Sequence, residues 1–206
     1  PTNVGADPVP WDKDAADIKA QGGNRLRVNP KIMQQSLSHL ILEDSVFGKI
    51  GPAANSGKSI FLYGPPGNGK TTIAESIGRM ILTNDMYIPI AVEVDGQIIK
   101  VFDEINHVAV PDIERKMSTG QLGPRRGDAR WVRIKRPVIM VGGELTLDGL
   151  ELIYDPTNKY YEAPFQMKAN GGMFLIDDFG RQQVRPRDLL NRWIVPMEKQ
   201  IDFLAL

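Results

Sequence analysis

The hydrophobic positions of this chain follow two periods, and the alternation between them predicts strands followed by helices. Residues 59–63 and 173–176 are short, continuous apolar runs, which is the pattern of strands buried on both faces of a parallel sheet. Apolar residues recur at helical spacing over 73–81 and again over 189–197, where Pro196 is expected to kink or end the helix. Strands that alternate with helices in this way indicate an α/β fold.

The first part of the chain has a different character. Residues 1–29 are polar and rich in Gly, Pro, Asp and Asn, so we expect a linker or an N-terminal arm that wraps around the core. Asn29 followed by Pro30 is a helix-start signal, and the apolar residues among 32–41 predict one apolar helix face. We expect residues 30–206 to form one domain, as a fragment of a longer protein that is incomplete on its C-terminal side.

Residues 86–144 are longer than a strand–helix–strand crossover requires, and part of this excess predicts an inserted β-hairpin. Residues 87–102 contain two strand-like runs joined by Asp95 and Gly96, a residue pair that two-residue hairpin turns favour. Two interpretations are open: the hairpin projects to contact a substrate or a neighbouring subunit, or it caps the sheet.

The segment between the first strand and its helix carries the strongest chemical signal. Residues 64–71 read Gly-Pro-Pro-Gly-Asn-Gly-Lys-Thr and satisfy the phosphate-loop (Walker A) pattern G-x-x-x-x-G-K-[ST]. Glycines let the backbone approach phosphate oxygens, Lys70 supplies positive charge to the β- and γ-phosphates, and the Thr71 hydroxyl is a Mg²⁺ ligand. The residues predicted to bind nucleotide are Gly64, Pro65, Pro66, Gly67, Asn68, Gly69, Lys70, Thr71 and Thr72.

A second Gly-Lys-Ser triplet lies just upstream, at residues 57–59, and competes for the same role. The pattern requires glycine at position 52, which is Pro52, and Gly51 is one residue out of register. Lys58 also precedes the predicted strand, so no helix N-terminus would help it to hold an anion. We therefore assign the phosphate site to Lys70 and interpret Lys58 as a solvated lysine.

The apolar run at residues 173–176 ends in two aspartates. Open α/β sheets bind ligands at the carboxyl ends of their strands, which is where Asp177 and Asp178 would lie. A phosphate loop needs an acidic partner for Mg²⁺, a Walker B role that Asp177 is predicted to fill. Asp178 is predicted to orient and polarise the attacking water, so Asp178 and Lys70 are the candidate catalytic residues. The alternative is a pair of turn aspartates after a core strand.

Composition narrows the remaining possibilities. The chain has 206 residues, 42% of them hydrophobic, which is enough for one domain with a hydrophobic core. Its 25 basic residues balance its 25 acidic residues, so no net charge attracts nucleic acid or acidic membranes. The absence of cysteine excludes disulfides and thiolate metal sites, and His39 and His107 are too few and too isolated for a zinc site. No apolar stretch approaches the ~20 residues of a membrane span, and no signal peptide is visible. We expect a cytoplasmic protein without membrane insertion.

The two nucleotide motifs together resemble those of AAA+ ATPases, the ring-forming branch of the phosphate-loop NTPases. Residues 160–203 are similar to the region of the second acidic motif in magnesium-chelatase, MoxR-like and σ54-activator ATPases, with an Ala169-Asn170-Gly171-Gly172 turn before the strand and Leu189-Leu190 in the helix after it. Residues 142–152 are also similar to magnesium-chelatase. The resemblance covers residues 30–206 and implies a three-layer α-β-α core, the cofactors ATP and Mg²⁺, ATP hydrolysis, a homo-oligomeric ring and a protein client.

Two features depart from the family pattern. Family members usually carry Asp-Glu where this chain has Asp177-Asp178, and aspartate is one methylene shorter, so nucleotide binding is implied more firmly than efficient hydrolysis. The family's sensor residues, its usual arginine finger and its helical lid are expected to lie outside this chain.

Two groups of basic residues remain. The first group, in residues 123–136 around Trp131, consists of Arg125, Arg126, Arg130, Arg133, Lys135 and Arg136. In one interpretation this group contacts nucleic acid, or a γ-phosphate across a subunit boundary. In the other, its positive charge protects a half-buried edge strand from pairing with other chains. We favour the edge strand, because the balanced total charge argues against a protein specialised for nucleic acid. The second group is Arg181, Arg185 and Arg187, which would meet a neighbouring subunit's nucleotide or, as we favour, lie on the surface of a loop.

Three functions follow from these features. The first is an AAA+ ATPase that couples MgATP hydrolysis to oligomer assembly and to remodelling of a protein partner. The second is a nucleotide-gated assembly or scaffold module with slow turnover. The third, a nucleic-acid motor, would depend on the arginine cluster and is not favoured.

Overall fold

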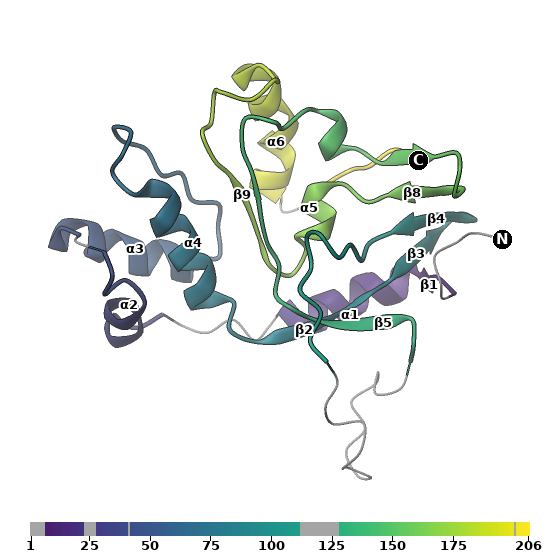
Figure 1. Cartoon of the computed structure of the whole chain (residues 1–206), viewed down its shortest axis with the longest axis horizontal. Coiled ribbons are helices and arrows are strands. Elements are labelled where there is room, and N and C mark those ends of the chain that lie inside the picture. Colours follow the sequence, from purple (N-terminus) through teal and green to yellow (C-terminus); the bar gives the residue numbers. More distant parts are fainter. Residues whose placement is uncertain (1–6, 23–27, 41, 112–127, 200) are drawn as a thin grey trace, which may run out of the picture.

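A computed structural model of the chain describes residues 7–22, 28–40, 42–111, 128–199 and 201–206. After the short strand β1, four helices follow one another along the chain, and most of the strands come after them (Figure 1). In chain order they are β1 (Val9–Pro10), α1 (Trp11–Gly22), α2 (Pro30–Ser36), α3 (Asp44–Ser56), α4 (Lys70–Ile81), β2 (Asp85–Pro89), β3 (Ala91–Val94), β4 (Gln97–Lys100), β5 (Trp131–Lys135), β6 (Val138–Val141), the 3-10 helix η2 (Asp148–Leu150), β7 (Ile153–Asp155), β8 (Tyr160–Glu162), α5 (Phe165–Lys168), β9 (Met173–Ile176) and α6 (Pro186–Lys199).

The described strands are divided among three sheets. A five-stranded sheet has the order β1-β3-β4-β8-β7, β2 pairs antiparallel with β5, and β6 pairs in parallel with β9. The five-stranded sheet is mixed, because β1 and β3 run parallel while β3 and β4 run antiparallel. The structure is therefore α/β, as the hydrophobic pattern predicts. A complete three-layer phosphate-loop core is not confirmed, because the described strands do not join into one sheet.

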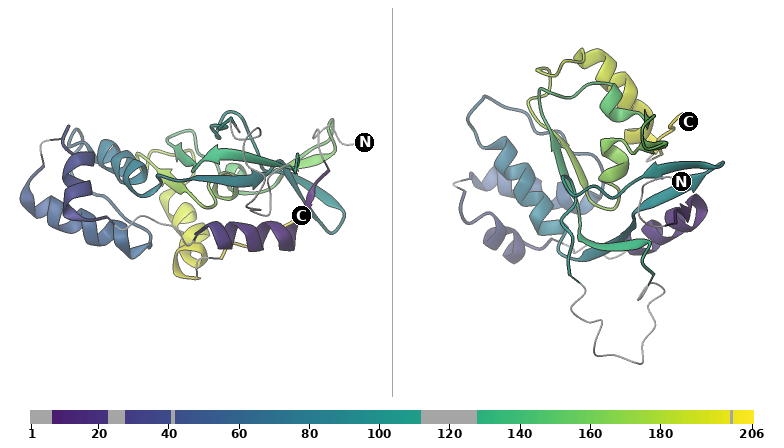
Figure 2. Two further views of the ribbon diagram at one scale, coloured as in Figure 1. Left: turned by 90° about the horizontal axis from the view of Figure 1, so that it is seen from below. Right: turned by 45° about the vertical axis from the view of Figure 1, so that its right-hand side comes forward.

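Three hydrophobic clusters hold the elements together. Helices α2, α3 and α4 gather at one end of the molecule around Leu37 and Ile77, as Figures 1 and 2 show. Strands β2 to β5 enclose a second cluster around Ile134, which is fully buried. Strands β6 and β9 and helix α6 share a third, which includes Val141 and Leu189. The helical end and the strands thus have separate cores.

Several predicted elements are confirmed. The Asn29 side chain caps α2 by accepting a hydrogen bond from the Ile32 N–H at 2.9 Å, although the helix ends earlier than its apolar pattern indicates. Helix α4 follows the phosphate-loop sequence and buries Ile73 and Ile77. Strand β9 forms at the apolar run before the two aspartates, and β5 forms within the basic segment.

The predicted hairpin is also confirmed, and the structure places it in the centre of the five-stranded sheet. Val94 pairs with Gln97, and the two residues between them, Asp95 and Gly96, have φ values of 49° and 77°. Positive φ at both positions is the requirement of a type I′ turn. Because β1 pairs with β3 and β8 pairs with β4, both outer edges of the hairpin are covered over part of their length. This arrangement favours a hairpin with a structural role in the sheet over a hairpin that projects to contact a substrate or a neighbouring subunit.

Residues 7–22, which belong to the segment expected to be a linker or an arm, pack against the strands. Strand β1 pairs with β3, and α1 follows it and lies along one face of the molecule (Figure 2). The Gln21 side chain donates to the Tyr87 carbonyl at 3.0 Å and accepts from the Tyr87 N–H at 2.7 Å. Arg136 in turn donates to the Gln21 carbonyl at 2.6 Å. These bonds attach the end of α1 to the β2–β5 sheet.

Residues 59–63 do not form the predicted strand. They lie outside every strand of the described structure, and Phe61 and Tyr63 are 70% and 85% exposed. The Phe61 ring contacts the rings of Tyr63 and Phe179, with centroids 6.3 Å apart in both pairs. An apolar run becomes a strand only where a neighbouring strand supplies hydrogen bonds, and the run itself does not encode that neighbour.

Pro196 does not end its helix, contrary to one of the two outcomes expected for it. Helix α6 continues through Pro196 to Lys199. A proline in a helix removes one N–H···O bond and crowds the preceding turn. The same helix buries Leu189 completely and packs Trp193 against Phe174 at 5.4 Å between ring centroids. Tertiary packing of this kind outweighs a local cost near a helix end.

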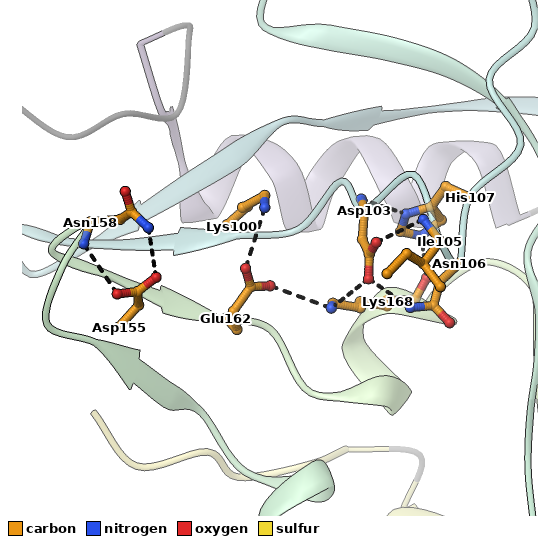
Figure 3. Close-up of polar contacts among 9 residues, drawn as sticks. All are labelled: Lys100, Asp103, Ile105, Asn106, His107, Asp155, Asn158, Glu162 and Lys168. Atoms are coloured by element: carbon orange, nitrogen blue, oxygen red, sulfur yellow. Dashed lines mark hydrogen bonds and ion pairs between the residues drawn. The ribbon is translucent and has the colours of Figure 1, made fainter.

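A cluster of charged residues joins the sheet to the loop after β4 and to α5 (Figure 3). Lys168 forms ion pairs with Asp103 at 2.9 Å and with Glu162 at 3.4 Å, and Lys100 pairs with Glu162 at 3.3 Å. The Lys168 and Asp103 side chains are only 10% and 15% exposed. Burial raises the pKa of Asp103, but hydrogen bonds from Lys168, from a backbone N–H and from Asn106 together lower that pKa to about 2.

His107 lies in the same cluster and is 3% exposed (Figure 3). Its Nδ1 accepts a hydrogen bond from the Asp103 N–H at 3.0 Å, and its Nε2 lies 2.9 Å from the Lys168 carbonyl. This pattern requires the neutral ring with its proton on Nε2. Burial is the main cause that lowers the pKa of His107 below 6.5; the Lys168 charge acts in the same direction, while the bond to the Lys168 carbonyl and the Asp103 charge oppose it.

We expect acid to destabilise this cluster in two steps. Because the folded-state pKa of His107 lies below 6.5, the unfolded chain binds the proton first, and the free energy of unfolding falls as the pH drops through and below that value. The pKa of Asp103 is lowered from 3.8 to about 2, so its contribution is present above 3.8 and is lost as the pH falls through about 2. Urea unfolding between about pH 7 and pH 5 isolates the first step.

His107→Gln should make the free energy of unfolding less dependent on pH in that range. His39→Gln repeats the same substitution at an exposed position and serves as the control. Equal slopes for the parent and His107→Gln would show that His107 does not titrate with unfolding.

Candidate phosphate-loop site

The predicted phosphate loop is an exposed turn that leads directly into α4. Lys70 is the first residue of the helix, and Gly69 before it has a left-handed backbone with φ of 68°. Gly67 also has a positive φ, of 82°, so a side chain would strain both positions. Residues 64–69 are exposed, and a Cβ added at Gly67 or Gly69 would meet open space. The loop can therefore bring its backbone close to an anion at the start of a helix.

Lys70 reaches back across the loop. Its Nζ donates to the Gly64 carbonyl at 3.1 Å and to the Pro65 carbonyl at 2.8 Å. These bonds hold the ammonium group beside the loop backbone. A phosphate that entered the loop would compete for the ammonium with two neutral carbonyls, and a charge-assisted bond to phosphate is the stronger one.

The two predicted nucleotide motifs meet through one side-chain hydrogen bond. The Thr71 hydroxyl donates to Asp177 Oδ2 at 2.8 Å, although 106 positions separate the two residues. The other carboxylate oxygen, Oδ1, accepts the Asp178 N–H at 2.9 Å. Strand pairing positions Asp177, because its N–H donates to the Val141 carbonyl of the neighbouring strand at 2.8 Å. The predicted magnesium ligands Thr71 and Asp177 are thus adjacent.

Asp178 lies beside these residues but faces solvent. Its side chain is 63% exposed, and it forms an ion pair with Arg181 at 3.6 Å. Its backbone is left-handed, with φ of 49°, which is uncommon for a residue other than glycine. The roles assigned to Lys70, Thr71, Asp177 and Asp178 stay predictions, as do those of the remaining loop residues; Asn68 is exposed and Thr72 is half-buried at the start of α4.

Lys58, the competing lysine, follows the end of a helix. Helix α3 ends at Ser56, and Gly57 is its left-handed C-cap. The C-terminal end of a helix carries partial negative charge, which favours a lysine and disfavours a phosphate. The position of Lys58 is therefore consistent with a solvated lysine.

Gln182 belongs to neither predicted motif, but it contacts the backbone of the turn that carries the two aspartates. Its side chain is buried and forms hydrogen bonds to the carbonyls of Asp177 and Asp178 and to the Gly180 N–H. The only sequence feature that points to Gln182 is its position shortly after the two aspartates, and this feature is weak.

Several residues of the basic groups have internal partners. Arg130 pairs with Asp128 at 2.7 Å, Arg133 pairs with Asp85 at 2.8 Å, and Arg136 is buried and donates to the Gly171 carbonyl at 2.6 Å. These contacts favour a structural role for this part of the segment. Lys135 is exposed, and Arg125 and Arg126 lie outside the described residues. Arg181 and Arg185 pair locally with Asp178 and Asp188, and Arg187 is exposed.

The donor set suits a magnesium ion that is bound together with nucleotide. Among the described residues, no group of three or more His, Cys, Asp or Glu side chains is placed to hold a metal. Mg²⁺ usually takes one or two protein oxygens and completes its octahedron with phosphate and water. Thr71 and Asp177 fit that pattern.

In the part of the chain that the structure describes, no helix has the length and apolar character to span a membrane.

Fold and site together define an α/β protein with a candidate nucleotide-phosphate site. No protein-family model matches the chain. The chain is similar to Replication-associated recombination protein A of Bacillus subtilis (strain 168), with 31% identity over 83 residues. The match includes 34% of this chain and 20% of that protein, so the chain spans about a fifth of the length of the curated relative that it matches.

Proposed function

We propose that this chain is the nucleotide-binding part of an AAA+ ATPase, which binds MgATP and couples its hydrolysis to oligomer assembly and to remodelling of a protein partner. The observation that carries the proposal is the 2.8 Å hydrogen bond between Thr71 and Asp177. It joins the last residue of a complete phosphate-loop sequence to the first of two aspartates after a strand in a parallel pair. The partial similarity to Replication-associated recombination protein A supports the ATPase class.

Each residue of the candidate site has a proposed role that follows from its position. The loop backbone and Lys70 would bind and orient the phosphates at the start of α4. Thr71 and Asp177 would hold Mg²⁺, which when bound neutralises charge on the β- and γ-phosphates. Asp178, whose carboxylate faces solvent, would orient a water molecule and accept its proton as the water attacks the γ-phosphate, whose bond to the departing ADP breaks.

The slow-turnover assembly module is the second candidate, and the side chain of Asp178 favours it. This carboxylate is shorter than glutamate and is 3.6 Å from Arg181, which neutralises part of its charge. Phosphate release and mass measurements on the full-length protein with MgATP separate the two proposals: the ATPase turns over, whereas the module binds and assembles without appreciable turnover. For the less favoured nucleic-acid motor, binding of DNA or RNA should weaken steeply with salt.

We expect Asp177→Ala to raise the Mg²⁺ concentration needed for tight nucleotide binding by about 10-fold to 100-fold, the usual effect of removing a group that supports a bound metal. The measurement is equilibrium nucleotide binding as a function of Mg²⁺ concentration. Asp12→Ala, at an exposed position in α1, is the matched control and should keep the parent's Mg²⁺ dependence. The same Mg²⁺ dependence in Asp177→Ala and the parent would remove Asp177 from the metal site.

A further inference from the structure

The turn that carries Asp177 and Asp178 is held by one buried amide group. Gln182 Nε2 donates to the Asp177 carbonyl at 2.7 Å and to the Asp178 carbonyl at 3.1 Å. Its Oε1 accepts the Gly180 N–H at 2.7 Å. Gln182 is only 9% exposed, so water competes weakly for these bonds. A single side chain therefore ties together both ends of the turn.

The backbone of this turn adopts a conformation that needs such support. Asp178 has φ of 49° and Gly180 has φ of 98°. A left-handed conformation is rare for aspartate and persists where the surrounding structure maintains it. The Asp178 carbonyl also accepts the Arg181 N–H at 2.9 Å, so it has two donors, of which Gln182 is one. Loss of the amide would free Asp178 to relax toward commoner backbone angles.

The carboxylate of Asp178 depends on this backbone for its position. Asp177 is fixed at both oxygens, by Thr71 and by the Asp178 N–H. Asp178 instead has a 3.6 Å ion pair with Arg181, and the two side chains are 63% and 74% exposed. Ion pairs between exposed side chains restrain little. The direction in which Asp178 points is therefore set mainly by the turn that Gln182 holds.

We propose that Gln182 is a positioning residue for ATP hydrolysis: it holds the left-handed turn so that the Asp178 carboxylate faces the attacking water. The inference rests on the proposed function of the site. Gln182 acts through Asp178 and has no contact of its own with the reacting atoms. It should therefore affect the chemical step far more than the binding of MgATP.

Gln182→Met tests this role, because methionine has nearly the same length and lacks both the donor and the acceptor. In the full-length protein we expect kcat to fall by about 10-fold to 100-fold, the scale of a misplaced catalytic group, while the Kd for MgATP stays within about 3-fold. Gln183→Met is the matched control, since Gln183 is the next residue and is exposed. A kcat for Gln182→Met equal to the parent's would overturn the proposal.

A second readout does not depend on activity. Amide hydrogen exchange in the nucleotide-free protein should become at least about 10-fold faster at Gly180 and Arg181 in Gln182→Met, and should stay unchanged in Gln183→Met, because only the first change opens the turn. Unchanged exchange at both amides would contradict the proposed support. If Gln182→Met does not fold, Gln182→Glu keeps the size and the acceptor but loses both donated bonds, and it should show the same loss of kcat.

A double variant separates positioning from general stability. Asp178→Asn combined with Gln182→Met should hydrolyse ATP at the rate of Asp178→Asn alone, because Gln182 has nothing left to position. Losses that multiply would show that Gln182 acts independently of Asp178 and would overturn the inference. A parent protein without turnover would overturn the ATPase function together with the positioning role. An active parent with an equally active Gln182→Met would overturn only the latter.

Discussion

Asp178→Asn is expected to hydrolyse ATP about 100-fold more slowly than the parent, or slower still, while it binds MgATP with nearly the same affinity. Asparagine keeps the shape and volume of aspartate but cannot accept the proton of the attacking water, and general-base assistance is worth about this factor. The affinity should hold because the carboxylate acts on the transition state more than on the bound substrate. Steady-state phosphate release beside equilibrium nucleotide binding measures both quantities.

Asp95→Asn is the matched control for this experiment. Asp95 has the same φ of 49° as Asp178 but lies in the turn of the β3–β4 hairpin, so the substitution repeats the chemical change at the same φ outside the candidate site. Its hydrolysis rate should equal the parent's. An unchanged rate in Asp178→Asn would exclude Asp178 as the catalytic base. Tight MgATP binding without turnover in the parent would favour the assembly module.

Asp178→Glu addresses the departure from the family pattern. If the shorter side chain limits turnover, the added methylene should raise the rate above the parent's. A lower rate would instead indicate that the left-handed turn places aspartate correctly and that glutamate overshoots.

Lys70→Ala is expected to weaken ATP binding by about 100-fold or more, and Lys58→Ala is expected to leave it nearly unchanged. Lys70 lies at the start of α4, where its charge and the helix N-terminus act on the same phosphates. Removal of a charge-assisted hydrogen bond costs about 1.5–3 kcal/mol, and Lys70 is predicted to contact two phosphates. Lys58 lies at the end of α3, where the helix favours cations over phosphate.

The two lysine variants are each other's control, since both remove an ammonium group that follows a glycine and precedes a serine or threonine. Titration with a fluorescent ATP analogue in the presence of Mg²⁺ measures both affinities. Equal losses in Lys70→Ala and Lys58→Ala would show that register and context do not select the phosphate site.

Elements whose cause is local could be predicted from the sequence. The Asp95-Gly96 turn forms because both residues tolerate positive φ, and α2 begins where Asn29 caps it. Helix α4 follows from an apolar face repeated at helical spacing. The residues of the candidate site could be proposed from the sequence for the same reason, because the phosphate-loop residues are consecutive and the aspartates directly follow their strand.

The elements that depended on distant partners were decided by the tertiary structure. Helix α3 was not predicted, because Gly48, Gly51 and Pro52 disfavour helix locally; the helix packs Ile50 against α4 in the cluster at that end of the molecule. Residues 59–63 have the composition of a strand without forming one in the described structure. The importance of Gln182 follows only from the folded structure, in which its side-chain amide forms hydrogen bonds with three backbone groups. Hydrophobic periodicity and turn preferences are properties of residues that are close in sequence. Strand pairing and buried hydrogen bonds instead involve residues that only the folded chain brings together.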